Sequence, residues 1–179
     1  MGIQILSFLL EVVAGLLGGA CLLRLYMQRQ KVPFGNPIGR FVFALTDWLV
    51  LPLRRVLPSI ARWDTASLVG AYLVELVRFL ILSGIVGGGL EMVPLLALMA
   101  LVMLAISAMT ALVIVYAILS WVQADSRMAD LLDRLVAPLL RPIRRVVPLV
   151  GGIDLSPLVL LVLLQVVQMV LTALFGRGF

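Results

Sequence analysis

Four long apolar stretches dominate the sequence, and the segments between them carry most of the charges. The stretches cover residues of about 3–26, 66–88, 94–121 and 157–175. Each is close to the roughly 20 mainly apolar residues that a helix needs to cross a bilayer. The pattern therefore predicts an all-α polytopic membrane protein with four transmembrane helices.

The two longer connecting segments contain a different, amphipathic pattern. Apolar side chains recur at helical spacing from Met128 to Leu140, and Asp130, Asp133 and Arg134 take the other face. Residues 41–50 repeat this pattern in the first half. Such helices are too polar to cross a membrane and suit the interface between lipid and water. We predict one interfacial amphipathic helix in each connecting segment.

Basic residues indicate how the chain is oriented. Arginine and lysine are concentrated in the two longer segments, whereas the glycine-rich hairpin of residues 87–94 has none and the C-terminal tail has only Arg177. Loops rich in these residues stay in the cytoplasm. We therefore expect cytoplasmic basic loops, and both termini on the opposite, periplasmic side.

The chain also repeats itself at an offset of 90 residues. Pro52-Leu-Arg-Arg-Val-Leu-Pro58 corresponds to Pro142-Ile-Arg-Arg-Val-Val-Pro148, and Asp64 corresponds to Asp154. Each half reads as span, basic segment, span, which predicts two tandem helical-hairpin repeats of parallel topology, at residues 1–90 and 91–179. Many secondary transporters have inverted repeats instead.

The motifs of the second half carry a family resemblance. They are Ser120-Trp121-Val122, Pro138, Pro142-Ile-Arg144-Arg145, Pro148 and Gly151-Gly152-Ile-Asp154-Leu-Ser156-Pro157. This pattern resembles the bacterial YggT family, which includes the YlmG proteins and plastid relatives. The first half is a degenerate copy, with Asp64-Thr65-Ala66-Ser67 in place of Asp-Leu-Ser-Pro.

The resemblance implies a small tandem-repeat protein of the bacterial inner membrane with an accessory, organising or assembly role. Relatives are linked to osmotic-stress tolerance, to cell-division gene neighbourhoods and, in plastids, to cytochrome b6 assembly and nucleoid distribution. The partners expected are an anionic phospholipid bilayer, a second copy of the chain, and a membrane or cell-division protein.

The repeated turns supply the first candidate site. We expect their prolines, Pro52, Pro58, Pro142 and Pro148, to end the amphipathic helices and fix the chain. Paired guanidinium groups can fork onto phosphate oxygens, so Arg54, Arg55, Arg144 and Arg145 are candidates for contact with anionic lipid or a partner protein. The alternative is that they only enforce topology and anchor the helix.

The aspartates that follow these turns have a simpler interpretation as helix caps. Asp154 or Ser156 would cap the fourth span, with Pro157 at its first helical position. Asp64 offers the same cap in the first half. A salt bridge from each aspartate back to its arginine pair is a second role.

Ionisable residues inside the apolar stretches supply the second candidate site. Glu11, Glu75 and Arg78 lie within predicted spans, and Gln165 and Gln168 stand at the repeat positions of Glu75 and Arg78. They form either a polar clamp between helices or a cation or proton site, to which Ser107 and Thr110 could add oxygen ligands and which would need an oligomer. Gly15, Gly18 and Gly19, with Gly15-x-x-x-Gly19 spacing, could supply a close helix contact, and Gly84-x-x-x-Gly88 could do the same.

The amino-acid composition excludes several kinds of functional site. Hydrophobic residues make up 63% of the chain, there is no His, and Cys21 is its one cysteine. These counts exclude an internal disulfide and any His/Cys zinc or His-ligated haem site. We expect no metal, no cofactor and no enzyme activity. The net charge of +5 does not indicate direct readout of nucleic acid, because the basic segments are short and lie against the bilayer.

Two functions stay open. The leading hypothesis is a non-enzymatic membrane organiser that uses the four arginines. The rival is an oligomeric cation or proton transporter that uses Glu11, Glu75 and Arg78.

Overall fold

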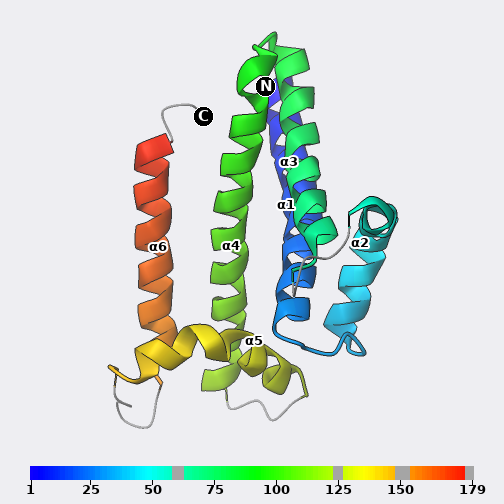
Figure 1. Ribbon diagram of the computed structural model, residues 1–179. Coiled ribbons are helices and arrows are strands. Elements are labelled where there is room, and N and C mark those ends of the chain that lie inside the picture. The colour runs from blue at the N-terminus through cyan, green and yellow to red at the C-terminus, as the bar shows by residue number, and fades with distance from the viewer. Residues whose placement is uncertain (58–62, 123–126, 148–153, 176–179) are drawn as a thin grey trace. The chain divides into compact units, whose positions relative to one another are not determined.

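The computed structural model describes residues 1–57, 63–122, 127–147 and 154–175. These residues contain six α-helices, one short 3₁₀ helix and no strand (Figure 1). The elements are α1 (Gly2–Arg29), α2 (Pro37–Val56), α3 (Thr65–Val86), η1 (Leu90–Met92), α4 (Val93–Trp121), α5 (Arg127–Arg144) and α6 (Ser156–Phe175). Within the described residues, four helical stretches are long and apolar enough to cross a membrane: Gly2–Arg29, Thr65–Val86, Leu90–Ser120 and Ser156–Phe175. The predicted all-α multi-span class is confirmed.

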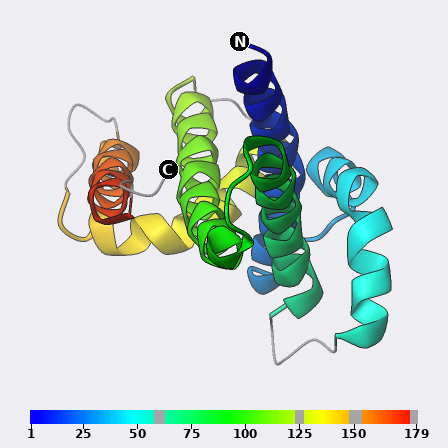
Figure 2. The same cartoon turned by 90° about the horizontal axis from the view of Figure 1, so that it is seen from above.

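The chain forms two compact units, Met1–Ala105 and Ile106–Phe179. In the first unit, α1 and α3 pack along each other, and α2 lies beside both (Figures 1 and 2). Small side chains allow this close packing, since one core cluster joins Cys21, Val50, Ala66, Ala71 and Leu101. A second cluster of Phe79, Val93, Ala97 and Ala100 joins α3 to the start of α4.

The start of α2 depends on a glycine. The Asn36 side chain accepts a hydrogen bond from the Gly39 N–H at 2.8 Å, as an N-cap does, and Pro37 takes the first helical position. A Cβ atom on Gly39 would lie 2.2 Å from the Phe34 carbonyl oxygen. Only glycine therefore lets the loop fold back this closely on the helix.

The predicted helix-ending role is wrong for Pro52 and Pro142. Pro52 lies inside α2, and Pro142 lies inside α5 together with Pro138, so neither ends its helix. A proline removes one backbone hydrogen bond and bends a helix, but helical bonding resumes beyond Pro52, where the Leu57 N–H donates to the Leu53 carbonyl at 2.8 Å. Figures 1 and 2 show that α2 changes direction along its length. Pro58 and Pro148 lie outside the described residues.

The second unit contains the rest of α4 together with α5 and α6, and α5 packs against α6. The buried face of α5 carries Leu132, Leu135, Val136 and Leu140. At the start of α6, Ser156 and Pro157 are buried. The consequence is that the arginine-bearing end of α5 lies in the same unit as the aspartate that precedes α6.

Two helix ends use left-handed residues. Gly87 ends α3 with φ of 75°, and its N–H donates to the Ser83 carbonyl at 3.0 Å. Lys31 follows α1 with φ of 54°. The Lys31 and Val32 N–H groups donate to the carbonyls of Gln28 and Met27, which is the Schellman pattern. Lysine thus occupies a position at which glycine carries no steric penalty.

Candidate functional site

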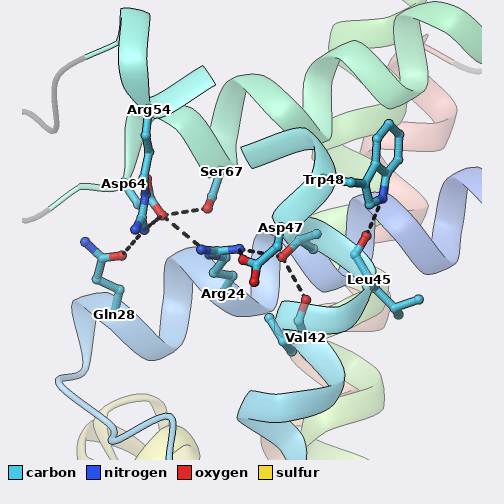
Figure 3. Close-up of polar contacts among 10 residues, drawn as sticks. Arg24, Gln28, Val42, Leu45, Asp47, Trp48, Arg54, Asp64 and Ser67 are labelled. Carbon is cyan, nitrogen blue, oxygen red and sulfur yellow. Dashed lines mark hydrogen bonds and ion pairs between the residues drawn. The ribbon is translucent and has the colours of Figure 1, made fainter. Parts of the chain in front are cut away.

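Arg24 on α1 is buried, with 2% of the residue exposed. Its Nη1 donates to Asp47 Oδ1 and to Thr46 Oγ1, each at 2.7 Å (Figure 3). The guanidinium carbon lies 4.7 Å from the centre of the Phe43 ring. A buried charge is tolerated only when it is paired and hydrogen-bonded. Arg24 therefore ties α2 to α1.

Asp64, just before α3, is the second centre of this network and is 1% exposed. It accepts from Arg54 through both carboxylate oxygens, at 2.5 and 3.3 Å, and from Ser67 Oγ at 2.6 Å. Arg54 also donates to Gln28 of α1 at 3.0 Å. Figure 3 shows these side chains converging from α1, α2 and the start of α3.

The charges in this network are matched. Burial acts to raise the pKa of Asp64, but the hydrogen bonds from Arg54 and Ser67 outweigh burial and hold that pKa below its ordinary value. Arg24 Nε lies 4.0 Å from Asp64 Oδ2. We call this set the first polar cluster: Arg24, Gln28, Thr46, Asp47, Arg54, Asp64 and Ser67.

The second unit has a related cluster. Arg144 Nε donates to Asp154 Oδ2 at 2.8 Å, and its Nη2 donates to the Tyr116 hydroxyl oxygen at 2.7 Å. Tyr116 donates in turn to Asp133 at 3.1 Å. Despite burial, the hydrogen bonds that Asp154 accepts from Ser156 and Arg144 lower the pKa of Asp154, and the bonds that Arg144 donates to Asp154 and Tyr116 raise the pKa of Arg144. These five residues form the second polar cluster.

One ion pair is common to both clusters. Arg54–Asp64 and Arg144–Asp154 each join residues ten positions apart, and the two pairs correspond at the repeat offset of 90. The salt bridge expected from each aspartate to its arginine pair is therefore present in each unit. It fixes the last turn of the arginine-bearing helix to the start of the following span.

Of the two aspartates predicted to cap a helix, only Asp154 makes a capping hydrogen bond. Asp154 Oδ1 accepts from the Ser156 N–H at 2.9 Å, and Pro157 lies in the first turn of α6. Asp64 holds the N-cap position of α3, but its side chain makes no capping hydrogen bond. Its carboxylate is instead turned toward Arg54 and the Ser67 hydroxyl.

The two arginines of each pair differ in their contacts, although the sequence treats them alike. Arg54 and Arg144 are in ion pairs. Arg55 and Arg145 are exposed, and their side chains make no hydrogen bond or ion pair with any residue that the structure describes. Each unit thus presents one bound arginine and, next to it, one with its donors free of protein partners in the described chain.

The structure brings the three intramembrane charges of the first unit together. Arg78 Nη1 lies 3.2 Å from Glu75 Oε2 on the same helix, and Nη2 lies 3.6 Å from Glu11 Oε2 on α1. The Glu75 side chain is 2% exposed, but that of Glu11 is 64% exposed. Two carboxylates therefore share one guanidinium, and the carboxylate of Glu11 is largely exposed.

The corresponding positions of α6 are different. Within the described residues, the side chains of Gln165 and Gln168 have no hydrogen-bond partner, and the Gln168 carbonyl accepts from Thr172 Oγ1 at 2.8 Å. Thr110 donates its hydroxyl to the Ile106 carbonyl at 2.9 Å within its own helix. No group of three Cys, Asp or Glu side chains in the described chain is arranged to hold a metal ion.

Of the glycines predicted to make a close helix contact, Gly18 does so, and the others do not. A Cβ atom on Gly15, Gly19 or Gly84 would meet nothing within 4 Å, and one on Gly88 would meet only Ser83 atoms at 3.8–3.9 Å. The close approach in the first unit is at Gly18, whose Cβ would lie 2.7 Å from Leu104 Cδ2. Spacing alone does not say which glycine faces a neighbouring helix.

Sequence reasoning missed four members of the first polar cluster. Local pattern singles out none of Arg24, Gln28, Thr46 and Asp47. A signal was present, because Asp47 follows Thr46, which lies on the same buried face of α2 as Val42 and Val50. A carboxylate beside that face indicates a buried cation nearby.

Comparison with known proteins gives consistent matches along the chain. The CCB3/YggT family model matches twice, at residues 3–85 and 95–175. The chain is 39% identical over 165 residues to the "Uncharacterized protein YggT" of Escherichia coli K12, covering 92% of this chain and 87% of the relative. It is 32% identical over 176 residues to the "Uncharacterized protein in proC 3'region" of Vibrio alginolyticus, covering 96% and 95%. An "Uncharacterized protein" of Haemophilus influenzae is 30% identical over 158 residues, covering 87% and 84%. No solved structure matches the chain.

Proposed function

The chain belongs to the CCB3/YggT family, and from this premise we propose that it is a non-enzymatic organising or assembly protein of the bacterial inner membrane. In this proposal the ends of α2 and α5 face the cytoplasm, where their arginines contact anionic phospholipid or a partner protein. Both termini lie on the periplasmic side, as the distribution of basic residues favours.

The observation that carries the proposal is the repeated ion pair. Arginines that only set topology need charge on the correct side of the membrane and no fixed geometry. Here Arg54 and Arg144 are both held by an aspartate ten residues later, and in both units the next arginine makes no hydrogen bond or ion pair with the residues that the structure describes. Duplication of the whole arrangement supports a surface of defined shape.

The strength expected of such a surface is modest. A basic residue close to an anionic leaflet contributes about 1 kcal/mol. Arg55 and Arg145, whose charges no carboxylate of the described chain offsets, would contribute about 2 kcal/mol together on the same basis, which is enough to favour anionic over zwitterionic lipid around the protein or to strengthen docking of an acidic partner.

The test compares the wild-type chain with a variant in which Arg54, Arg55, Arg144 and Arg145 are all replaced by Gln. Anionic phospholipid retained after mild detergent extraction is measured by mass spectrometry, and protein neighbours are measured by crosslinking in intact cells. Loss of either contact supports the proposal. If a variant with wild-type helical content retains both at the wild-type level, the proposal is wrong.

A second candidate, oligomeric cation or proton transport, rests on the Glu11–Arg78–Glu75 group. Ionisable side chains within spans are costly and are functional candidates by default. Two carboxylates against one arginine leave a negative charge on a side chain that is largely exposed. Flux into proteoliposomes that is lost in both Glu11→Gln and Glu75→Gln would support transport, and wild-type flux no higher than in empty liposomes would exclude it.

A further inference from the structure

The two arginines of each pair are both exposed, but within the described chain only the first of them, Arg54 or Arg144, is in an ion pair. We propose that Arg55 and Arg145 bind the phosphate groups of anionic phospholipid, whereas Arg54 and Arg144 only position the helix ends. This inference rests on the proposed function and assigns its ligand to one arginine of each pair.

The two arginines of each pair differ in whether a carboxylate of the chain already matches their charge. Arg54 has an aspartate on two of its nitrogens and Gln28 as a further acceptor. Arg144 is held by Asp154 and Tyr116. A guanidinium binds phosphate most strongly when its fork of donors and its charge are not already matched by a carboxylate. Within the described chain, Arg55 and Arg145 meet that condition.

The C-terminal end of α2 lies near the end of the first span. Val50 of α2 lies in one core cluster with Cys21 of α1. Cys21 lies eight residues before the end of α1 at Arg29, which is about 12 Å along a helix that rises 1.5 Å per residue. Beyond Val50, Arg54 donates to Gln28 in the last turn of α1 at 3.0 Å, so the C-terminal end of α2 lies beside the end of the first span, where we expect the lipid headgroups.

The outward face of α2 carries exposed aromatic side chains. Phe41 and Trp48 are 56% and 63% exposed. The indole N–H of Trp48 donates to the Leu45 carbonyl at 2.8 Å, so the outward ring has its polar atom satisfied within the helix. Such aromatic residues gather at the boundary between hydrocarbon and headgroups. Arg55 follows Trp48 by seven residues, about 10 Å along the helix, with the bend at Pro52 between them.

Both units place an apolar side chain beside the unpaired arginine. Arg55 is followed by Val56, which is 78% exposed, and Arg145 by Val146, which is 81% exposed. An apolar side chain adjacent to a free guanidinium suits a boundary at which the valine meets acyl chains and the arginine meets phosphate. An acidic protein partner would match the charge but not the exposed apolar side chains.

The experiment measures lipid preference locally. In a chain with Trp63→Phe and Trp121→Phe, Trp48 alone reports the lipids beside α2, and its quenching by dibrominated phosphatidylglycerol is compared with quenching by dibrominated phosphatidylcholine in proteoliposomes. For the second unit, Val146→Trp with all three native tryptophans replaced by Phe reports the lipids beside Arg145.

We expect a preference for the anionic lipid of about fivefold at each reporter, the ratio that corresponds to about 1 kcal/mol per arginine. Arg55→Gln should reduce the ratio beside Trp48 to about one, and Arg145→Gln should do the same beside position 146. The matched controls are Arg40→Gln and Arg134→Gln, which remove the same charge from exposed positions of the same two helices and should leave the ratio unchanged.

Three results would overturn the inference. If the control variants reduce the ratio as much as Arg55→Gln and Arg145→Gln, only general charge matters, and the proposed function survives without this assignment. If a folded Arg54→Gln chain loses the preference while Arg55→Gln keeps it, the assignment within the pair is reversed. If the wild-type chain has no preference, the ligand is not anionic lipid, and in-cell protein crosslinks then decide whether the proposed function stands.

Discussion

Removing the carboxylate of Asp64 should destabilise the protein much more than removing that of Asp154. The two aspartates hold equivalent positions in the repeats and bind equivalent arginines. Their surroundings differ, because the Asp64 side chain is 2% exposed and that of Asp154 is 19% exposed. Replacement by Asn keeps the size of the side chain and removes only its charge.

The expected loss of folding free energy depends on how deeply each ion pair is buried. Removing one partner of a buried ion pair costs about 3–5 kcal/mol, because the other charge stays buried without compensation. We expect about 3 kcal/mol for Asp64→Asn, at the lower end of that range, because its partner Arg54 is 40% exposed and Arg24 keeps its bond to Asp47. For Asp154→Asn we expect about 1 kcal/mol, the value of a largely solvated pair. For a chain of this size these correspond to decreases in Tm of about 6–12 °C and about 2–4 °C.

The assay is thermal unfolding in mild detergent, followed by loss of helical circular dichroism. Asp130→Asn serves as the control, since Asp130 is exposed and has no side-chain partner within the described residues, and it should leave Tm unchanged. A double-mutant cycle with Arg54→Gln should show strong coupling to Asp64. If Asp154→Asn lowers Tm as much as Asp64→Asn, burial does not set the strength of these pairs and the reasoning fails.

Three further predictions concern local geometry and pH. Lys31→Gly should stabilise the protein by about 1 kcal/mol, seen as a higher Tm, because glycine takes the left-handed conformation without steric cost. Gly39→Ala should destabilise it by about 1–3 kcal/mol, as overpacking does, since the new Cβ would meet the Phe34 carbonyl; an unchanged Tm would contradict this. The pKa values of Asp64 and Asp154 are lowered from 3.8, so the unfolded chain takes up protons first as pH falls. Stability from these groups should be constant well above pH 4, decline as pH falls through the lowered folded pKa values, and change less in the Asn variants.

Much of the fold follows from local pattern. The four spans could be predicted because a run of apolar residues long enough to cross a bilayer has few other stable conformations. The Arg–Asp pairs could be anticipated because two identical spacings recur in the chain. Glu75 and Arg78 could be placed together because residues three apart share a helix face.

What could not be predicted depends on contacts between distant segments. The rule that proline ends a helix is local, and it fails at Pro52 because helical hydrogen bonds form on both sides of the bend. Burial of Arg24 requires α2 to fold back onto α1, and no local pattern in α1 encodes that. The division of labour between Arg54 and Arg55 depends on which side of the helix end faces Asp64.

The bond between Arg24 and Asp47 also has a consequence for the order in which the chain is built. Arg24 is synthesised 23 residues before its partner, so α1 enters the membrane with a cation that has no counterion yet. That charge is neutralised only when α2 has been made and has turned back, and Asp64 arrives later still. Assembly of the first unit is therefore stepwise, because Arg24 has its counterions only after α2 has folded back against α1 and the start of α3 has followed.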